Sequence, residues 1–490
     1  MMRNCRKVFT MTSRKHCIAT IAKTFGSKAY KVYFESMLEK DGKIYFLAGK
    51  GLKKYLVSDD TKFEKSVEKV STYNVYEKTH LNALRLRNSF KHLNPVACGI
   101  KRSFGFGDRL GLATPGHIKT IEGRDIFPIF SQQSIREMER TGRSMEIVLD
   151  DAMWGVFQEG YRGGYGADID HVKKQEDVIK ACECGYTMYT IDPSDYINDS
   201  VNDMGSISNT DFYEKLYLGK SYKIGAETYK MNKSELMKVV SIYTKALEHI
   251  VDCFNIAKER VSTGFDFEVS VDETDTPTTL LAHIFIVEEL RRNRVNFTSL
   301  ALRFIGEFEK GIDYIGDIEM FKNEFSAHAA MCRHFGGYKL SIHSGSDKFS
   351  IYPTIAESTK GVFHIKTAGT NWLEAVRLIS HKNPAFYRRM HQTALSNFEK
   401  DRKSYHVTTD LSKIPALDKL SNEELPKLLD ENNSRQLMHI TYGSILKDMK
   451  EEIYKTLNIY ENEHYEMLRA HLGKHLDLAG ISKNVSTYPK

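Results

Sequence analysis

The sequence predicts an α/β protein whose main part is a (β/α)8 barrel of the TIM type, and two observations support this. Eight short apolar or β-branched runs follow one another between about residues 98 and 369, and polar residues and helical stretches separate them. Strands that alternate with helices form right-handed βαβ units and a parallel sheet. Eight such units within about 290 residues fit one closed barrel better than an open, doubly wound sheet.

The eight runs are the predicted strands. They are Ala97–Gly107, Asp125–Phe130, Gly164–Asp170, Tyr186–Asp192, Phe265–Asp272, Ser299–Gly306, Tyr338–Gly345 and Gly361–Gly369. One connection is long, because a polar stretch and a helix-rich stretch occupy about residues 195–262. We expect this helical insertion after the fourth strand to form a lid over the substrate, since such loops often close active sites.

Two further regions flank the predicted strands. Residues 1–96 are typical of a small N-terminal α+β domain, in which Lys43–Ser58 is expected to form a hairpin around Gly49-Lys50-Gly51. The second domain, 97–490, contains the barrel with its helical insertion and a C-terminal helical extension. We expect these charged C-terminal helices, after about Ser380, to pack against the barrel or a partner subunit.

Composition excludes several classes of protein. Of the 490 residues 41% are hydrophobic, and 26 Phe and 26 Tyr suffice for a large core. No apolar run approaches the ~18–20 residues that a membrane helix requires. Seven scattered cysteines without a CxxC pair indicate a reducing compartment, so we expect a cytoplasmic protein.

The net charge of +6 does not indicate a nucleic-acid partner. Residues 1–34 carry eight Lys or Arg and no Asp or Glu, and the rest of the chain carries 62 basic and 64 acidic residues. A nucleic-acid-binding protein usually has basic residues interleaved with aromatic ones on its working face. We therefore expect a small-molecule partner, no nucleic acid and no membrane, and the sequence leaves a homo-oligomer open.

Polar side chains gather at the ends of the predicted strands. In a (β/α)8 barrel the active site lies at the C-terminal ends of the strands. Carboxylates and imidazoles that converge on one barrel mouth are the donors that a divalent metal needs. The best ligand candidates, each from a different strand, are His171, Glu268, His343 and His364.

Glu268 is the most informative of these residues. It lies inside the apolar run FDFEVSV, where burial of a carboxylate costs free energy unless a cation or a metal pairs with it. Alternate residues of a strand share a face, so Asp272 points the same way as Glu268. By the same argument His364 and Lys366 share a face.

The segment GFGDRLG, Gly105–Gly111, does not read as a dinucleotide-binding motif. Its spacing is GxGxxxG rather than GxGxxG, and the chain has no Walker loop, HExxH or GxSxG motif. Three close glycines at the end of a first strand more simply let the backbone approach a substrate. Positive charge around the mouth suits a carboxylate or phosphate, or balances the acidic residues, and comes from Arg109, Arg303, Lys348 and Lys366.

Several motifs together resemble the tagaturonate epimerase family. The resemblance covers about residues 98–380, and its segments are Ser103–His117, Trp154–Lys173, Arg303–Asp317, Tyr338–Pro353 and His364–Ala375. It implies an isomerase of bacterial hexuronate breakdown that interconverts D-tagaturonate and D-fructuronate with a divalent metal. The metal itself is left open among zinc, manganese, nickel, cobalt and iron.

The implied reaction constrains the roles of the strand-end residues. The two sugar acids differ at a carbon two bonds from the ketone, so its C–H is not acidic and a retro-aldol cleavage with re-addition explains the inversion. We assign Asp170 and Glu268 as acid/base candidates and His171, His343 and, more weakly, His364 as metal ligands. The substrate-binding candidates are Asp108, Arg109, Gln133, Asp192, Arg303 and Lys366.

Two other functions fit the same residues. A metal-dependent sugar-acid aldolase would use nearly the same site but release its fragments. A non-catalytic sugar-acid-binding barrel would be expected to have lost some of the acid or metal positions, which look intact here.

Overall fold

The computed structural model describes residues 11–198 and 210–483, with side chains from residue 18 onward. It divides into two compact units, one of Met1–Asn94 with Asp150–Gly163 and one of Pro95–Leu149 with Gly164–Lys490. Of the expected 195–262 insertion, residues 199–209 lie outside the described part.

The first unit is an antiparallel sheet with helices. Its five strands lie in the order β1-β2-β3-β5-β4. Aromatic side chains fill its core, where Phe25 packs edge-on against Phe46 and Tyr30. The predicted hairpin is confirmed, since β2 and β3 pair antiparallel and Gly51 has a φ of +63° in the turn. The elements are α1 (Met11–Gly26), β1 (Lys31–Lys40), β2 (Lys43–Lys50), β3 (Lys53–Ser58), β4 (Ser66–Val70), β5 (Tyr73–Glu77) and α2 (His80–Ser89).

The second unit confirms the predicted (β/α)8 fold. Eight parallel strands close into a barrel in the order β12-β13-β14-β15-β6-β7-β8-β9. Each of the eight predicted runs contains or overlaps one of them. The strands are β6 (Ser103–Phe106), β7 (Phe127–Ser134), β8 (Gly166–Val172), β9 (Met188–Ile191), β12 (Asp266–Val271), β13 (Ser299–Leu302), β14 (Lys339–Ile342) and β15 (Phe363–Thr367).

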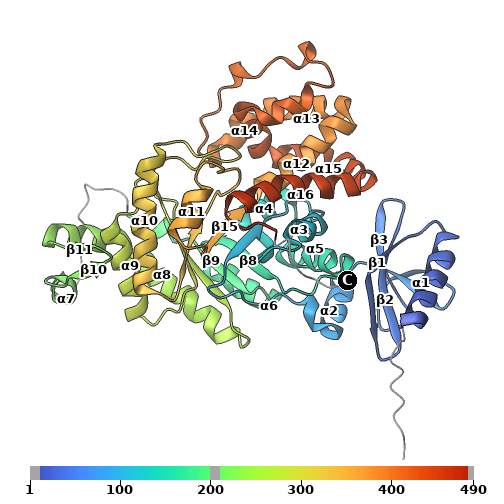
Figure 1. Cartoon of the computed structure of the whole chain (residues 1–490), viewed down its shortest axis with the longest axis horizontal. Helices are drawn as coiled ribbons and strands as arrows, with labels where there is room; N and C mark the ends of the chain where they lie inside the picture. The colour runs from blue at the N-terminus through green and yellow to red at the C-terminus, as the bar shows by residue number, and fades with distance from the viewer. Residues whose placement is uncertain (1–10, 199–209, 484–490) are drawn as a thin grey trace, which may run out of the picture. The chain divides into compact units, whose positions relative to one another are not determined.

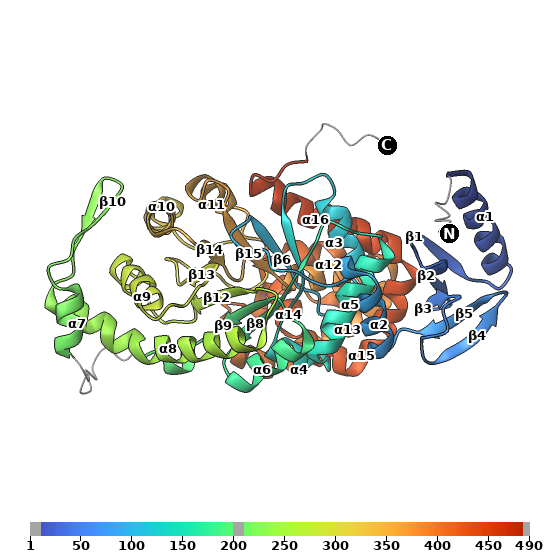
Figure 2. The ribbon, with the colours of Figure 1, turned by 90° about the horizontal axis from the view of Figure 1, so that it is seen from below.

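Helices surround this barrel, as Figure 2 shows. Their apolar sides pack on strands that are buried on both faces, the arrangement that gives a parallel barrel its near-continuous apolar runs. The helices are α3 (Thr114–Ile121), α4 (Ile135–Thr141), α6 (Gln175–Cys184), α8 (Lys233–Arg260), α9 (Leu280–Arg292), α10 (Ile318–Phe335), α11 (Tyr352–Ser358) and α12 (Gly369–Lys382). The helix α5 (Met145–Gln158) is divided between the two units.

The insertion after β9 lies beside the outer helices in its described part. It contains α7 (Thr210–Tyr217), the hairpin β10 (Tyr222–Ile224) and β11 (Glu227–Tyr229), and α8. Both ribbon views place α7 and β10 beside α9 and α10, and Tyr217 bonds to Glu289 of α9. This outward position is not that of the lid that the sequence led us to expect.

The C-terminal helices form one group on the barrel, the orange and red part of Figure 1. They are α13 (Pro384–Asp401), α14 (Asn432–Ile440), α15 (Tyr442–Ile459) and α16 (Glu461–Leu478). Their core is continuous with α12 of the barrel, and in it the indole N–H of Trp372 donates to the carbonyl of Met438 at 2.8 Å. This group therefore packs against the barrel, one of the two expected positions.

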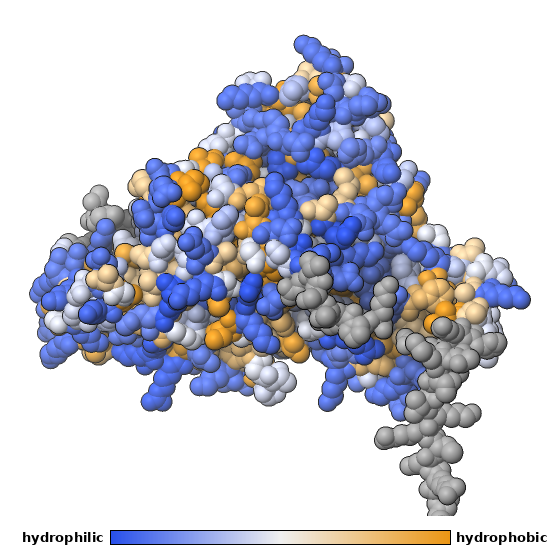
Figure 3. Space-filling view, in the orientation of Figure 1, coloured by the Kyte–Doolittle hydropathy of each residue, from blue (hydrophilic) through white to orange (hydrophobic). Residues whose placement is uncertain are grey.

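The surface shows no membrane-crossing feature among the described helices. None of them combines the length and apolarity that a membrane span requires. Most side chains on the face drawn in Figure 3 are hydrophilic, and the hydrophobic ones are scattered.

A chain of buried side chains links α9 and α10. His283 Nδ1 lies 2.9 Å from His328 Nδ1, and His283 Nε2 lies 2.7 Å from the Tyr338 hydroxyl. Only one of the two Nδ1 atoms can carry a hydrogen, so at least the accepting imidazole is neutral. Burial accordingly lowers the pKa of His328 to about 4 and that of His283 well below its ordinary value.

We therefore expect the free energy of unfolding to fall as the pH drops from about 6.5 toward 4. A histidine whose folded pKa is depressed contributes its full stability above the unfolded pKa and loses it as protons bind to the unfolded chain. His328 alone accounts for up to about 3 kcal/mol. Urea unfolding at pH 7.5 and pH 5 measures the slope, which His328→Leu should reduce and His334→Leu, at an exposed histidine of the same helix, should leave unchanged. An equal slope in His328→Leu would contradict this account.

Candidate active site

A cavity opens at the C-terminal ends of the barrel strands. Strand ends and the C-terminal helices both contribute to its wall, so two parts of the sequence far from each other build one site. Its main polar lining residues are Arg109, Gln132, Arg136, Asp170, His171, Lys310, His343, Ser344, Ser346, Lys366, Tyr405 and His439.

Lys366 of β15 lies at the centre of this site. Its ammonium is 2.7 Å from the carboxylates of Asp168 and Asp170 and 2.8 Å from that of Glu268. It also donates to the hydroxyl of Thr190 at 2.5 Å. All these side chains are buried, so three carboxylates share one ammonium in a region of low dielectric constant.

The three carboxylates differ in their affinity for a proton. Burial and the neighbouring carboxylates raise the pKa of Asp168 to about 7, although Lys366 acts in the opposite direction. Burial also opposes ionisation of Asp170, but Lys366 and the nearby histidines hold its pKa below the ordinary value. Of the three carboxylates around Lys366, Asp170 is therefore the one that is ionised and also lines the cavity.

His171 and His343 face each other, with ring centroids 4.8 Å apart. His343 Nε2 lies 2.7 Å from Glu268, and its Nδ1 lies 3.2 Å from Asp272. His171 Nδ1 lies 3.3 Å from Asp192. Despite burial, these carboxylates raise the pKa of His343 to about 9 and contribute, with Asp170, to that of His171 at about 10.

A distortion of β8 brings two neighbouring residues to the same mouth. Successive side chains of a regular strand point to opposite faces. The pairing of β8 with β9 shifts register between Ile169 and Val172, and His171 has a φ of +51°. A non-glycine residue in this region is strained, and such strain is typical of functional sites. The shift lets both Asp170 and His171 reach the cavity.

The donors around the two imidazoles fit a divalent cation. Ligand atoms of His171, Asp272 and His343 all lie within 4.8 Å of one another, and so do those of His171, Asp192 and Glu273. Imidazole and carboxylate donors suit zinc, manganese, iron, cobalt and nickel. Carboxylates also outnumber the single ammonium here, so either protons on the imidazoles or a cation must balance the charge.

His364 is not brought together with the other two histidines. It shares the face of Lys366, as expected, but its Nδ1 bonds to Ser103 Oγ at 2.9 Å at the start of β6. Burial lowers its pKa to about 3, so it is a neutral side chain in a deeper layer of the barrel. Among the described residues it joins none of the groups that could hold a metal.

Three of the predicted substrate-binding residues are bonded to other groups of the protein. The carboxylate of Asp108 accepts the backbone N–H groups of Leu110, Gly111 and Ala113 and holds that turn. Arg109 lines the cavity but pairs with Glu137 at 2.8 Å and lies 3.9 Å from the ring centroid of Tyr442. Arg303 pairs with Glu307 at 3.1 Å, in an outer pocket that adjoins the first.

Gln132 rather than Gln133 faces the cavity. The pairing of β7 with β8 shifts register between Ile129 and Ser131, and this reverses which of the two glutamines points inward. Gln133 instead donates to the carbonyl of Gln132 at 3.1 Å. Gly105 leaves room for the inward side chain, since a Cβ there would lie 1.7 Å from Gln132 Oε1.

No sequence pattern indicated that four of the residues lining the cavity belong to the site. Lys310 follows β13 and Arg136 lies in α4, where charged side chains are common on solvated faces. Tyr405 and His439 come from the C-terminal helical region, and no periodicity places that region over the barrel mouth. Asp272 did carry a signal, because it shares the face of Glu268.

Comparison with known proteins agrees with this geometry. Residues 33–479 match the model of a family described as tagaturonate epimerase. A tagaturonate/fructuronate epimerase of Thermotoga maritima is 47% identical over 478 residues, which are 94% of this chain and 99% of that protein. The native crystal structure of a fructuronate-tagaturonate epimerase from Cohnella laeviribosi is 41% identical, with a TM-score of 0.89, and the match covers 95% of this chain and 100% of that one.

Proposed function

This chain belongs to the tagaturonate epimerase family, and from that membership we propose that it interconverts D-tagaturonate and D-fructuronate in a metal-assisted reaction. It is an isomerase, and it matches a tagaturonate/fructuronate epimerase over nearly the full length of both chains. The observation that carries the proposal is the ionised carboxylate Asp170 beside Lys366 and two imidazoles in one cavity. Its cytoplasmic location and oligomeric state stay predictions.

The substrates require a particular kind of inversion. Their configurations differ at a carbon two bonds from the ketone, so the carbonyl does not acidify its C–H bond. In a retro-aldol step a base removes the hydroxyl proton of that carbon. The bond from that carbon to the carbon next to the ketone then breaks, and its electron pair is delocalised onto the ketone oxygen. An enediolate and an aldehyde result. When the aldehyde presents its other face, the bond reforms and the proton returns to oxygen.

Asp170 is the base that we assign to this step. Its side chain is 11% exposed and lines the cavity, whereas the side chains of Asp168 and Glu268 are fully buried against Lys366. Lys366 keeps Asp170 ionised before the transfer and stabilises the charge around it afterwards. Glu268 therefore acts through His343 and Lys366 and does not meet the substrate.

His171, His343 and Asp272 are the residues that we assign to hold the cation. A divalent metal bound there would act as a Lewis acid toward the ketone oxygen. Asp192 and Glu268 contact His171 and His343 and fix the orientations of the two rings, as carboxylates commonly do behind metal-binding histidines.

We assign the substrate carboxylate to Lys310 and Arg136. Arg109, Arg303 and Lys366 are each paired with carboxylates, whereas Lys310 and Arg136 donate hydrogen bonds to neutral oxygens. Lys310 donates to Ser344 Oγ, and Arg136 donates to the carbonyl of Ser404 at 3.2 Å. Tyr405 and His439 of the C-terminal region complete the wall and help to retain both fragments.

A proton NMR time course with tagaturonate in D2O tests the proposal. We expect fructuronate to form after Mn2+ is added to EDTA-treated enzyme, and not before. The retro-aldol path breaks no C–H bond at the inverted carbon, so that hydrogen should remain protium in the product.

Three results would contradict parts of this proposal. Deuterium at the inverted carbon would exclude the retro-aldol path. Undiminished turnover with EDTA would exclude the metal. A free three-carbon product without fructuronate would indicate an aldolase that releases its fragments.

A further inference from the structure

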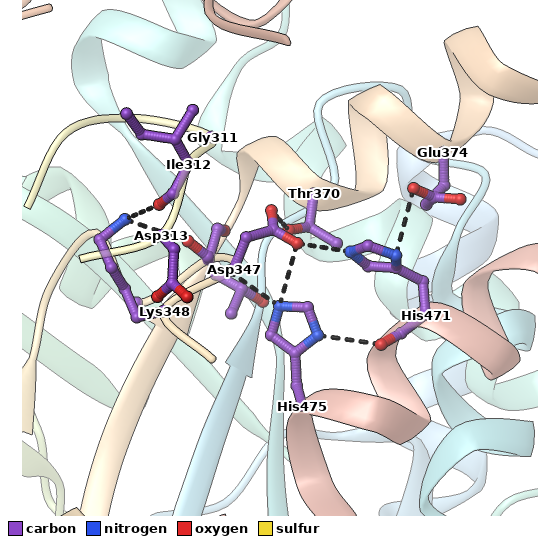
Figure 4. Close-up of polar contacts among 12 residues, drawn as sticks. Gly311, Ile312, Asp313, Asp347, Lys348, Thr370, Glu374, His471 and His475 are labelled. Carbon is purple, nitrogen blue, oxygen red and sulfur yellow. Dashed lines mark hydrogen bonds and ion pairs between the residues drawn. The ribbon is translucent and has the colours of Figure 1, made fainter. Parts of the chain in front are cut away.

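A second group of titratable residues lies behind the loop that follows β14, outside the cavity. Figure 4 shows Asp347 of this loop between the side chains of Thr370 and His471, with His475 beside it. Four separate elements contribute: the loop itself, α12, α14 and α16. We call Asp347, Thr370, Glu374, Arg435, His471 and His475 the Asp347 cluster.

Both carboxylate oxygens and the backbone N–H of Asp347 have hydrogen-bond partners within this cluster. His471 Nε2 lies 2.5 Å from its Oδ1. Its Oδ2 accepts from Arg435 Nη2 and from Thr370 Oγ1, each at 2.8 Å. Its backbone N–H donates to His475 Nε2 at 3.0 Å. The carboxylate is buried, so its charge is balanced by these donors and not by water.

The spacing of Asp347, His471 and His475 resembles a metal site, but their lone pairs are in use. His475 Nδ1 lies 2.9 Å from the carbonyl of His471, so it carries the hydrogen and Nε2 is the acceptor of the Asp347 N–H. The guanidinium of Arg435 also occupies the other side of the carboxylate. This arrangement favours a proton on His471 over a metal ion.

His471 connects two buried carboxylates. Besides Asp347, its ring meets Glu374 of α12, with Nδ1 3.4 Å from Oε1. A carboxylate on each side of the ring favours the charged, doubly protonated form of the imidazole. The charge would tie α16 to α12 and to the loop at the same time.

The loop that is tied in this way is strained and forms part of the cavity. Ser344 and Asp347 both have positive φ angles, 49° and 62°, although neither is glycine. Such conformations persist only where surrounding contacts determine them. Ser344 and Ser346 of the same loop line the cavity beside His343.

The same contacts reach the segment that carries Lys310. Arg435 Nε donates to the carbonyl of Gly311 at 2.7 Å. The next loop residue, Lys348, is buried and donates from Nζ to the carbonyls of Glu309 at 2.8 Å and Ile312 at 2.5 Å. Asp347 and Lys348 therefore hold both cavity loops, 309–312 and 344–348, in one arrangement.

From this geometry we infer that protonated His471 is a positioning residue, which bridges Asp347 and Glu374 and keeps the 344–348 loop in the conformation that completes the active site. The inference rests on the proposed function for its effect on turnover. His471 touches no lining residue of the cavity in the described contacts, so its action passes through Asp347.

The bridge should weaken in alkali. The charged and titratable groups that face His471 are Asp347, Glu374, Arg435 and His475. Burial would lower the pKa of His471, but the two carboxylates outweigh burial and Arg435 and raise it. The bridge is therefore intact below the ordinary pKa of histidine and is lost as the pH rises through the raised value.

Two variants and a control test the inference. His471→Asn removes the charge, and we expect kcat to fall between about tenfold and a hundredfold because the loop shifts relative to the substrate. Glu374→Gln leaves the Asp347 contact in place, so we expect normal turnover at pH 6.5 and an alkaline limb about one pH unit lower than in the parent. Arg469→Ala, on an exposed ion pair of the same helix, should change neither.

The charge on His471 is measured independently of turnover. In enzyme with 15N-labelled histidine, the signal that His471→Asn removes should be that of a doubly protonated ring at pH 7.5, and Glu374→Gln should shift its titration downward. A neutral ring at pH 7.5, or an alkaline limb unmoved in Glu374→Gln, would overturn the inference. If the ring is charged but the parent enzyme does not epimerise tagaturonate, the bridge stands and the proposed function fails.

Discussion

Asp170→Asn should lower kcat by about two to four orders of magnitude while the protein stays folded and binds metal. General-base catalysis by a positioned carboxylate contributes about 10²–10⁴ to a rate. The amide keeps the shape of the side chain and still accepts from Lys366, but it cannot take the hydroxyl proton. KM should change little, because the substrate carboxylate is assigned to other residues.

Steady-state turnover at saturating metal measures this effect, with Asp195→Asn as the matched control. Asp195 follows β9, is 65% exposed and pairs with Lys173 on the surface, so its loss should leave kcat unchanged. If Asp170→Asn retained more than about a tenth of the parent kcat, another group would remove the proton. Asp168 would then be the first alternative, because burial raises its pKa to about 7.

The barrel and the residues at its mouth were predictable from the sequence for one physical reason. Parallel strands end at the same rim, so polar residues after successive apolar runs must converge. Asp170, His171, Glu268, His343 and Lys366 do so. The alternation of FDFEVSVD also placed Asp272 on the face of Glu268, although it was not chosen as a ligand.

The depth of a side chain within the barrel and the register of a bulged strand were not predictable from the sequence. His364 shares a face with Lys366, but alternation does not show which of their two layers forms the mouth of the barrel and which lies below it, beside Ser103. Gln133 was chosen in place of Gln132 because the bulge at Ile129 and Ser131 leaves no mark in the sequence.

The segment of the chain that lies over the active site was not predictable from the sequence either. Helices from residues 384–478 pack on the barrel through tertiary contacts alone, and local patterns carry no information about such contacts. The sequence therefore favoured the insertion after β9 as a lid. In the structure, Tyr405 and His439 from the C-terminal region line the cavity, while the described part of the insertion packs on outer helices.

Lys366→Met should destabilise the fold by about 3–5 kcal/mol and abolish activity. Removing one partner of a buried ion pair leaves the other charge uncompensated, and that loss exceeds the net worth of the pair. Here Asp168, Asp170 and Glu268 would all lose the same ammonium. In the variant their pKa values should rise, so its deficit should shrink as the pH falls and grow as the pH rises.

Urea unfolding of metal-free protein at pH 6 and pH 8 measures this deficit against the parent at the same pH. Lys220→Met is the matched control, because Lys220 pairs with Glu288 at 3.5 Å with its side chain 47% exposed. An exposed pair is worth about 0–1 kcal/mol, so the control should stay near the parent. Adding Asp168→Asn to Lys366→Met should recover part of the stability, because it removes one buried carboxylate that has no cationic partner. It should not restore activity, because Asp170 still lacks the ammonium of Lys366. A deficit below about 1 kcal/mol, or one that does not depend on pH, would mean that protons already neutralise these carboxylates and that Lys366 is not what keeps Asp170 ionised.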